Sequence, residues 1–168
     1  MAATFEALAT VTVGSGGAAN IEFTSIPGTY TDLVVKVSGR STSTSTGADI
    51  TFNNNSTSYT NRRLYGTGSS TGSDTNSTTF VSNTMIVDSS YTANTFGNGE
   101  FYIPNYTSSN NKSVSVDGVT ENNSSTALMM FTASLWSNSA AITSIKITPV
   151  LGSLTQYSTA TLYGIKNS

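Results

Sequence analysis

The sequence predicts an all-β protein, a single-domain antiparallel β-sandwich of about ten or eleven strands. Short segments rich in β-branched and aromatic residues recur along the chain, and clusters of Gly, Asn, Ser and Asp separate them. Turn signals spaced by roughly 8 to 12 residues are typical of a sandwich, and several segments alternate apolar and polar side chains with period two. Because no longer period recurs, propellers and solenoids are disfavoured, and a jelly roll is the leading topology.

The strand prediction follows from these alternating segments, taken in order. Pro27 and Gly28 are typical of a type II turn between two strands, with Gly28 at the positive φ that this turn needs. We expect the first segment, within residues 1–13, to be an N-terminal arm or an edge strand. The expected strands are residues 5–13, 21–23, 33–37, 50–52, 59–65, 80–87, 99–103, 114–119, 127–136, 142–150 and 161–165.

Two of these segments have an alternative interpretation. Residues 127–136 and 142–150 could be helical, but Thr, Ser and β-branched residues favour strands, joined by a short hairpin loop at residues 136–140.

Three polar tracts lie between expected strands. The tracts at 39–49, 67–78 and 120–126 are expected to be exposed loops, since small polar side chains can satisfy their own backbone there.

Length and composition favour one domain, residues 1–168. No Pro-rich linker or charge run divides the chain, and a chain of this size buries roughly 70% of the surface that it exposes when unfolded. Cys is absent, so there are no disulfides. Ser and Thr make up about a third of the residues, but eight Tyr, seven Phe and many β-branched residues argue against disorder.

Charge and hydropathy make some partners improbable. The net charge is −2 and only 10% of residues are charged, too little to attract phosphate backbones or anionic lipid. The first residues lack the basic region followed by an apolar region that is typical of a secretory leader. No stretch approaches the ~20 consecutive apolar residues that a membrane span needs. We therefore expect no nucleic acid, no membrane and no secretory leader.

Residue chemistry argues against an enzyme. Without His or Cys, the Ser-His-Asp, Cys-His and zinc-hydroxide arrangements are impossible. The acids are scattered: Asp117 and Glu121 would lie roughly 13 Å apart along a strand, and turn residues are the better interpretation of both. Four lysines remain formally possible nucleophiles. We expect no catalytic residue, no cofactor and no metal, although Asp49, Asp74 and Asp88 in loops could join backbone carbonyls around calcium.

Candidate partner contacts are few. Arg62 and Arg63 form the one basic pair, which could bind an acidic partner surface or guard a strand edge against aggregation. Tyr65 follows them, and Phe5 and Leu8 give residues 2–13 enough apolar character to add a strand to a neighbouring sheet edge. Trp136 ends an apolar segment, so we expect it in the core rather than on a ligand platform.

Four stretches of the sequence resemble one family. They are "ATFEALATVTVGSGGAANIEFTSIPGTYTDLVVKVSGRS", "DITFNN" followed by "YTNRRLYGTG", "LWSNSAAITSIKI" and "ATLYGIK". Together they resemble small β proteins of tailed-bacteriophage virions, described as minor capsid, decoration or fibre-type proteins. The proline turn, the positions Leu135 to Ile142 and the segment Leu162 to Lys166 carry the resemblance most specifically.

The resemblance implies a virion structural role without enzymatic activity or cofactor. The leading hypothesis is a capsid decoration or cement protein on the outer surface of the virion, a homo-oligomer with a trimer favoured, whose partner is the major capsid protein. The alternative is a receptor-binding module of a tail or head fibre that recognises host surface glycans through loop Tyr, Asn and Asp residues. A polysaccharide depolymerase is a distant third, because no carboxylate pair is evident.

Overall fold

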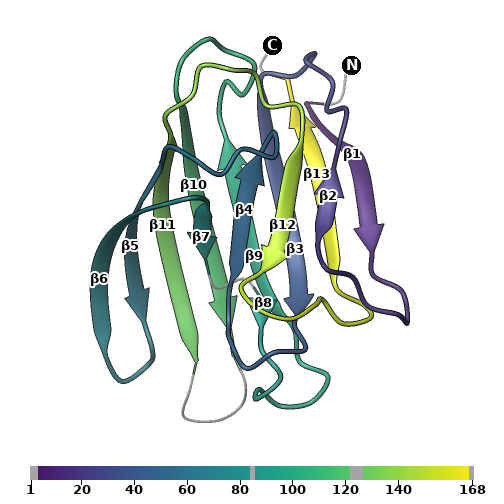
Figure 1. Cartoon of the computed structure of the whole chain (residues 1–168), viewed down its shortest axis with the longest axis vertical. Helices are drawn as coiled ribbons and strands as arrows, with labels where there is room; N and C mark the ends of the chain where they lie inside the picture. Colours follow the sequence, from purple (N-terminus) through teal and green to yellow (C-terminus); the bar gives the residue numbers. More distant parts are fainter. Residues whose placement is uncertain (1–3, 84–85, 122–126, 167–168) are drawn as a thin grey trace.

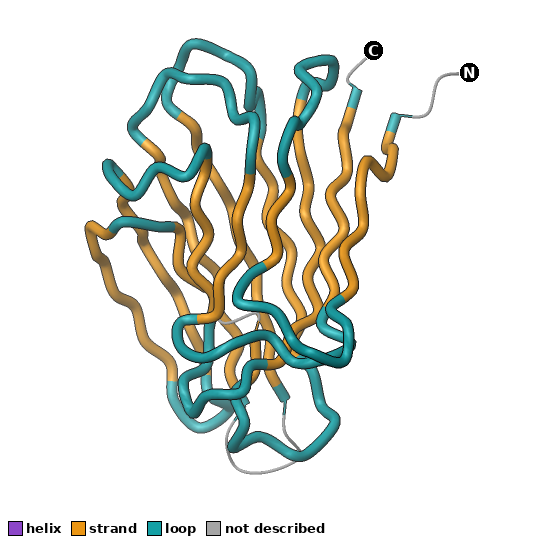
Figure 2. The backbone as a smooth tube through the Cα atoms, turned by 45° about the vertical axis from the view of Figure 1, so that its right-hand side comes forward, coloured by secondary structure: helices purple, strands orange, loops and turns teal. Residues whose placement is uncertain are grey.

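The computed structural model describes residues 4–83, 86–121 and 127–166. These residues form thirteen β-strands and no helix, and thus no helix long enough to cross a membrane. The strands build two sheets that face each other, with loops gathered at both ends (Figures 1 and 2). The predicted all-β sandwich is confirmed, with more strands than expected.

The larger sheet has nine strands in the order β1-β13-β3-β9-β10-β11-β5-β6, with β8 beside β3. All neighbours in it are antiparallel except β3 and β8. Its strands are β1 (Phe5–Thr12), β3 (Asp32–Arg40), β5 (Tyr59–Gly66), β6 (Thr71–Thr78), β8 (Ile86–Val87), β9 (Gly97–Ile103), β10 (Lys112–Thr120), β11 (Leu128–Trp136) and β13 (Thr159–Ile165).

The smaller sheet has four antiparallel strands in the order β2-β12-β4-β7. They are β2 (Ile21–Phe23), β4 (Ala48–Phe52), β7 (Val81–Asn83) and β12 (Ile145–Pro149). This sheet covers one face of the larger sheet, so each strand of the larger sheet beneath it turns alternate side chains into a shared core. No described strand covers the other face of the larger sheet.

One cluster of buried apolar side chains joins the two sheets. Trp136, Phe52 and Tyr59 form its aromatic centre, with ring centroids 5.6 to 6.0 Å apart. The expectation that Trp136 lies in the core is confirmed, since it is fully buried. Tyr59 also donates its hydroxyl hydrogen to Asn55 O and accepts a hydrogen bond from the Phe52 amide, which satisfies its polar end inside the core.

Several sequence-based expectations about local structure are wrong. Residues 80–87 do not form one strand, because β7 belongs to the smaller sheet and β8 to the larger sheet. The polar tract 67–78 is mostly not loop, since residues 71–78 form β6, the edge strand beside β5. Residues 136–140 are not a hairpin loop, because the chain there crosses from β11 in one sheet to β12 in the other.

Two further points concern turns and topology. Gly28 does not take a positive φ, and Ser25 takes one instead (φ 54°), so the turn after β2 is not the expected type II turn at Pro27. A jelly roll has eight strands. The two sheets here have nine and four strands, and the order of the strands in them does not establish that topology. The jelly-roll topology therefore stays a prediction. Of the tract 120–126, most lies outside the described residues.

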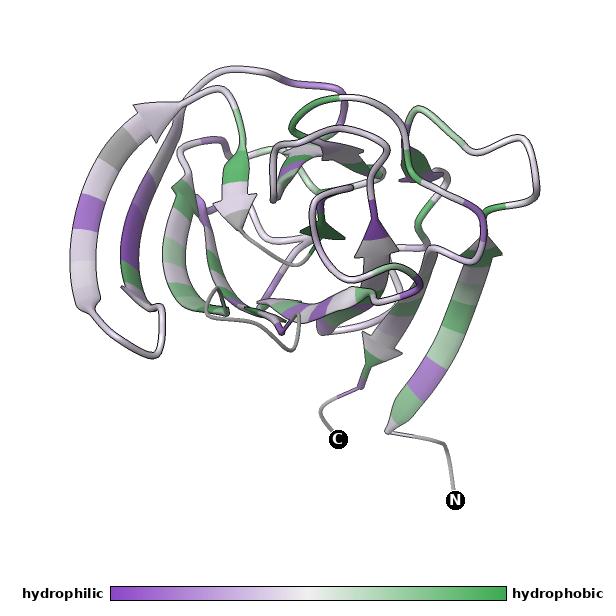
Figure 3. Cartoon of the chain, turned by 90° about the horizontal axis from the view of Figure 1, so that it is seen from below, coloured by the Kyte–Doolittle hydropathy of each residue, from purple (hydrophilic) through white to green (hydrophobic). Residues whose placement is uncertain are grey.

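The first strand closes one edge of the larger sheet. Among the described strands, β1 has β13 as its single neighbour, with a register shift between Ala7 and Ala9. At the opposite edge lies β6, whose single neighbour in the described part of the chain is β5. Figure 3 shows the contrast in their character: β1 is mostly hydrophobic, whereas β6 is pale to hydrophilic along its length. Polar side chains on an exposed edge are one way in which proteins discourage pairing with other chains.

Candidate interaction surface

The uncovered face of the larger sheet presents apolar side chains where polar ones are usual. On β10 the buried residues Val114 and Val116 turn inward, so Asp117 and Val119 occupy outward positions. On β11 Trp136 and Thr132 turn inward by the same alternation. The outward positions of β11 are therefore Met129, Phe131, Ala133 and Leu135.

Four of these outward side chains and Leu64 of β5 form one patch, which we name the apolar sheet face. Pairing across the strands sets Val119 opposite Met129, and sets Phe131 opposite Leu64 of β5. The exposed fractions are large for apolar residues: Leu64 61%, Met129 58%, Phe131 53%, Val119 38% and Leu135 37%. Exposed apolar residues are common singly, but a contiguous group on one sheet face marks an interaction site.

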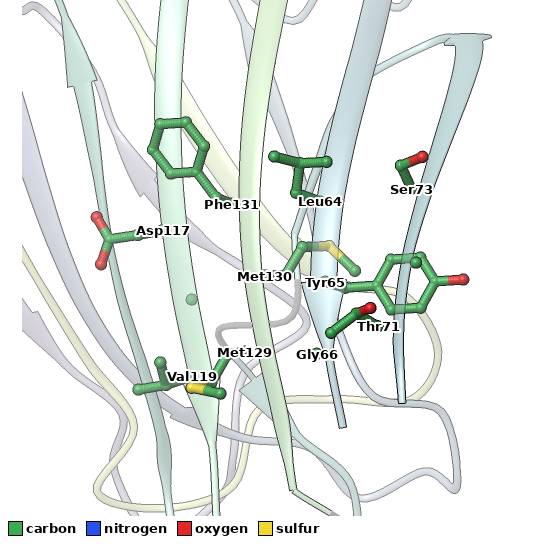
Figure 4. A pocket seen from close by; sticks show the side chains of 12 residues that line it. Leu64, Tyr65, Gly66, Thr71, Ser73, Asp117, Val119, Met129, Met130 and Phe131 are labelled. Atoms are coloured by element: carbon green, nitrogen blue, oxygen red, sulfur yellow. The ribbon is translucent and has the colours of Figure 1, made fainter. Parts of the chain in front are cut away.

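A shallow groove runs along this patch. It has a volume of about 720 Å³ and is lined by residues of β10, β11, β5 and β6, including Met129, Phe131 and Leu64. Figure 4 shows Met129 next to Val119 and Phe131 next to Leu64, each pair reaching across two neighbouring strands. The groove is open to solvent along its length, so it suits a protein surface better than an enclosed small molecule.

Charged residues border the apolar sheet face on the side of β9. Lys36 forms an ion pair with Glu100 (Nζ to Oε2, 3.1 Å), and Asp117 lies opposite Glu100 on the neighbouring strand. Burial, and then the nearby Glu100 carboxylate, raises the pKa of Asp117. The patch thus has an apolar centre and a mixed-charge rim, as protein interfaces do.

The structure separates the two arginines that the sequence places side by side. Arg62 is exposed on the same face as Leu64, and its Nη1 donates to Asn61 O. Arg63 points to the opposite face, where Nε and Nη2 donate to the two carboxylate oxygens of Asp74 at 2.6 and 2.8 Å. Strand β5 lies between β11 and β6, so the pair does not guard a sheet edge. Only Arg62 is placed to contact a partner beside the apolar sheet face.

The other predicted contact residues lie apart from this surface or face away from it. Phe5 is 47% exposed on β1, and its ring lies 4.7 Å from that of Tyr163. Leu8 packs against the protein's own core. Tyr65 follows Leu64 in β5 and so faces the other way, against Gly72. The structure therefore brings Arg62 close to the patch and places Tyr65 in the lining of the groove, whereas Phe5 and Leu8 lie elsewhere.

The acidic residues that the structure describes are dispersed. No three acidic side chains among them come close enough to hold a metal ion. Asp49 and Asp74 belong to strands β4 and β6, so they are not the loop acids that we expected, and Asp117 lies within β10 rather than in a turn. Lys112 is buried, and its Nζ donates to backbone carbonyls of Ser108 and Asn138 at 2.8 and 3.5 Å.

The sequence did not predict the apolar sheet face, because segment 127–136 has apolar residues at both its odd-numbered and its even-numbered positions. Met129 and Phe131 occupy one parity of β11, and Met130 and Trp136 occupy the other, so periodicity alone could not say which side faces solvent. An excess of apolar residues on both faces of one strand was the available signal. It indicates a strand that is covered on both sides, whereas the described residues cover only the inner face of β11.

The chain matches no family model, and comparison with curated proteins and with solved structures finds no match. The function of the protein is therefore inferred from the apolar sheet face and from the resemblance of its sequence to virion β proteins.

Proposed function

We propose that this protein is a structural protein of a bacteriophage virion, a capsid decoration or cement protein that binds the assembled shell of major capsid protein. The observation that carries the proposal is the apolar sheet face, because an exposed cluster of Leu, Met, Val and Phe on a rigid sheet is suited to adhesion. The four sequence stretches that resemble virion β proteins supply the identity of the partner.

The geometry of the patch supports a preformed docking surface. Its side chains stand on β10, β11 and β5, central strands whose backbones are paired on both sides, so little order has to be gained on binding. Phe131 supplies a large anchor, and Met129 supplies a flexible side chain that adapts to a partner. The bordering charges of Lys36, Glu100 and Asp117 would fix orientation more than affinity.

Stabilisation of a shell follows from mass action. A protein that binds the assembled shell but not free subunits lowers the free energy of the shell at each occupied site, and many modest sites add up. The proposal includes a homo-oligomer, a trimer, on the outer surface of the capsid, which would multiply the contacts that each copy makes. Adhesion, not conversion of a substrate, is the proposed activity.

The direct test is binding to phage heads that were assembled without this chain. Phe131→Ser and Met129→Ser should each weaken binding by about tenfold or more, as loss of an interface anchor does. Leu151→Ser is the matched control, because Leu151 is 58% exposed like Met129 but lies outside the patch. Equal binding by all three variants would contradict the role of the apolar sheet face.

Copy number separates this proposal from a fibre module. A cement protein should be present in amounts comparable to the number of capsomers, whereas a fibre component should be far rarer. Quantitative mass spectrometry of purified particles measures the ratio of this chain to major capsid protein. A ratio far below one copy per capsomer would overturn the cement role, even if the protein remained part of the virion.

A further inference from the structure

Tyr157 has an unusual backbone for its size. Its φ is 72°, in the left-handed region, whereas the other described residues with positive φ are glycines or Asn and Ser. Small polar residues tolerate this region, but for a bulky side chain it is a real outlier. The side chain is 67% exposed, so burial in the core does not offset the strain.

The backbone position itself has a structural reason, but the aromatic ring does not. The Tyr157 amide donates to Val13 O at 2.9 Å, and the Ser158 amide donates to Thr155 O at 3.2 Å, which fixes a tight turn before β13. Glycine or asparagine would serve this turn with less strain. Strain retained at an exposed residue is a reason to look for a binding role.

Tyr157 lines a cavity of about 450 Å³, together with residues of the loop between β8 and β9. Phe96, partly buried, is a second aromatic residue of the lining, and Asn94 and Gln156 are lining residues whose side-chain amides can both donate and accept hydrogen bonds. The volume falls within the range of small-ligand sites. The lining residues are Arg40, Asn94, Phe96, Thr155, Gln156 and Tyr157.

Arg40 holds both walls of this cavity in place. Its guanidinium donates to the carbonyls of Thr92, Thr95 and Tyr91, each at 3.0 Å, and to that of Ser89 at 3.3 Å. Its own carbonyl accepts the Thr155 amide at 2.8 Å. The cation is thus committed to the protein's own backbone, and the cavity lining has no carboxylate, so the site has no free charge to offer a ligand.

We propose that this cavity is a binding site for a neutral glycan, with Tyr157 as the platform on which a sugar ring stacks. The apolar C–H face of a pyranose ring fits an exposed aromatic face. The amides of Asn94 and Gln156 match sugar hydroxyls, which also donate and accept hydrogen bonds. The site is distinct from the apolar sheet face, so this proposal does not depend on the proposed capsid role.

The test uses the intact protein and neutral short oligosaccharides of glucose, galactose, mannose and N-acetylglucosamine. Amide chemical shifts in ¹H–¹⁵N spectra should move for Tyr157, Asn94 and Gln156 with at least one of these sugars. Tyr157→Gly should then weaken affinity by at least about tenfold. Because glycine accepts a positive φ, the same variant should unfold at an unchanged or higher temperature, which separates loss of the ring from loss of the fold.

Leu151→Ala is the control for a general change at this end of the molecule, since Leu151 is exposed but does not line the cavity. It should bind the sugar as the unchanged protein does. The proposal is overturned if none of the sugars moves these amide signals, or if Tyr157→Gly binds with undiminished affinity. Shifts that map to the apolar sheet face instead would also contradict it.

Discussion

The ring of Tyr30 lies directly on Gly164 of β13. A Cβ atom at position 164 would lie 2.5 Å from the Cγ and Cδ1 atoms of Tyr30, closer than side chains approach. In this position the Tyr30 hydroxyl donates to Glu6 Oε2 of β1 at 2.9 Å. The Lys166 Nζ lies 5.1 Å from the centroid of the Tyr30 ring. Glycine at 164 therefore allows one aromatic side chain to hold the edge strand in place.

Substitution of Gly164 should loosen this edge. We expect Gly164→Ala to lower the free energy of unfolding by about 1–3 kcal/mol, because the ring must move away from both Gly164 and Glu6. Urea denaturation measures the loss, and hydrogen exchange should be faster in β1. Gly66→Ala is the matched control in another strand, since its nearest atom, Met129 Cε, is 3.8 Å away. Equal losses at the two positions would contradict this account.

Asp49 should make stability depend on pH. Burial raises the pKa of its carboxyl from 3.8 to about 6, and its Oδ1 is buried without a hydrogen-bond partner. The pKa of Asp49 is higher in the folded protein than in the unfolded chain. Its favourable contribution to the free energy of unfolding is therefore complete below about pH 4 and is lost as the pH rises through about 6. Protein with ionised Asp49 is therefore less stable than protein with the neutral group.

Asp49→Asn removes this titration. At pH 7 the variant should be more stable than the unchanged protein by about 1–2 kcal/mol, less than the full shift implies because the side chain is partly solvated. The difference should shrink between pH 6 and pH 4, as measured by denaturant unfolding at each pH. Parallel stability curves for the two proteins would show that Asp49 does not titrate in this way.

The two adjacent arginines should respond differently to the same conservative change. Arg63→Lys replaces a bidentate pair with Asp74 by a single contact, and should cost about 0.2–1 kcal/mol of stability. Arg62→Lys should cost almost nothing, because among the described residues the Arg62 side chain donates to no group beyond the neighbouring Asn61 carbonyl. The Arg63 effect should diminish in high salt. Equal effects would mean that the ion pair contributes no stability.

Lys112 should prove structural rather than reactive. Burial lowers the pKa of its amine, and the Nζ donates to the backbone carbonyls of Ser108 and Asn110. Lys112→Met leaves these acceptors unpaired, and we expect a loss of about 1–3 kcal/mol in unfolding free energy. Lys146→Met, at a partly exposed ion pair with Glu22, should change stability by less than about 0.5 kcal/mol.

The sequence was sufficient for the fold class, because alternation is a local property. Val114 and Val116 alternate with Ser113, Ser115 and Asp117, and this pattern corresponds directly to the buried and exposed faces of β10. Trp136 could also be assigned to the core, since it ends an apolar segment between polar ones. Both inferences need only neighbouring residues, which is why they agree with the structure.

Features that depend on distant residues were not predictable in the same way. Strand β6, TGSDTNST, has almost no intrinsic strand preference, and it is a strand because the whole of β5 pairs with it. The break between Val81 and Ile86 follows from which sheet each residue joins. The apolar sheet face was missed for the same reason: nothing local reveals which side of β11 the second sheet covers.

The position of β13 has a consequence for how this protein is made. It is the last described strand, yet it lies between β1 and β3, which are among the first. While the ribosome is still producing the middle of the chain, β1 has no partner and β3 lacks one of its neighbours. The larger sheet can close only after β13 has been synthesised, so this sheet should form slowly, as structures dominated by long-range pairing do.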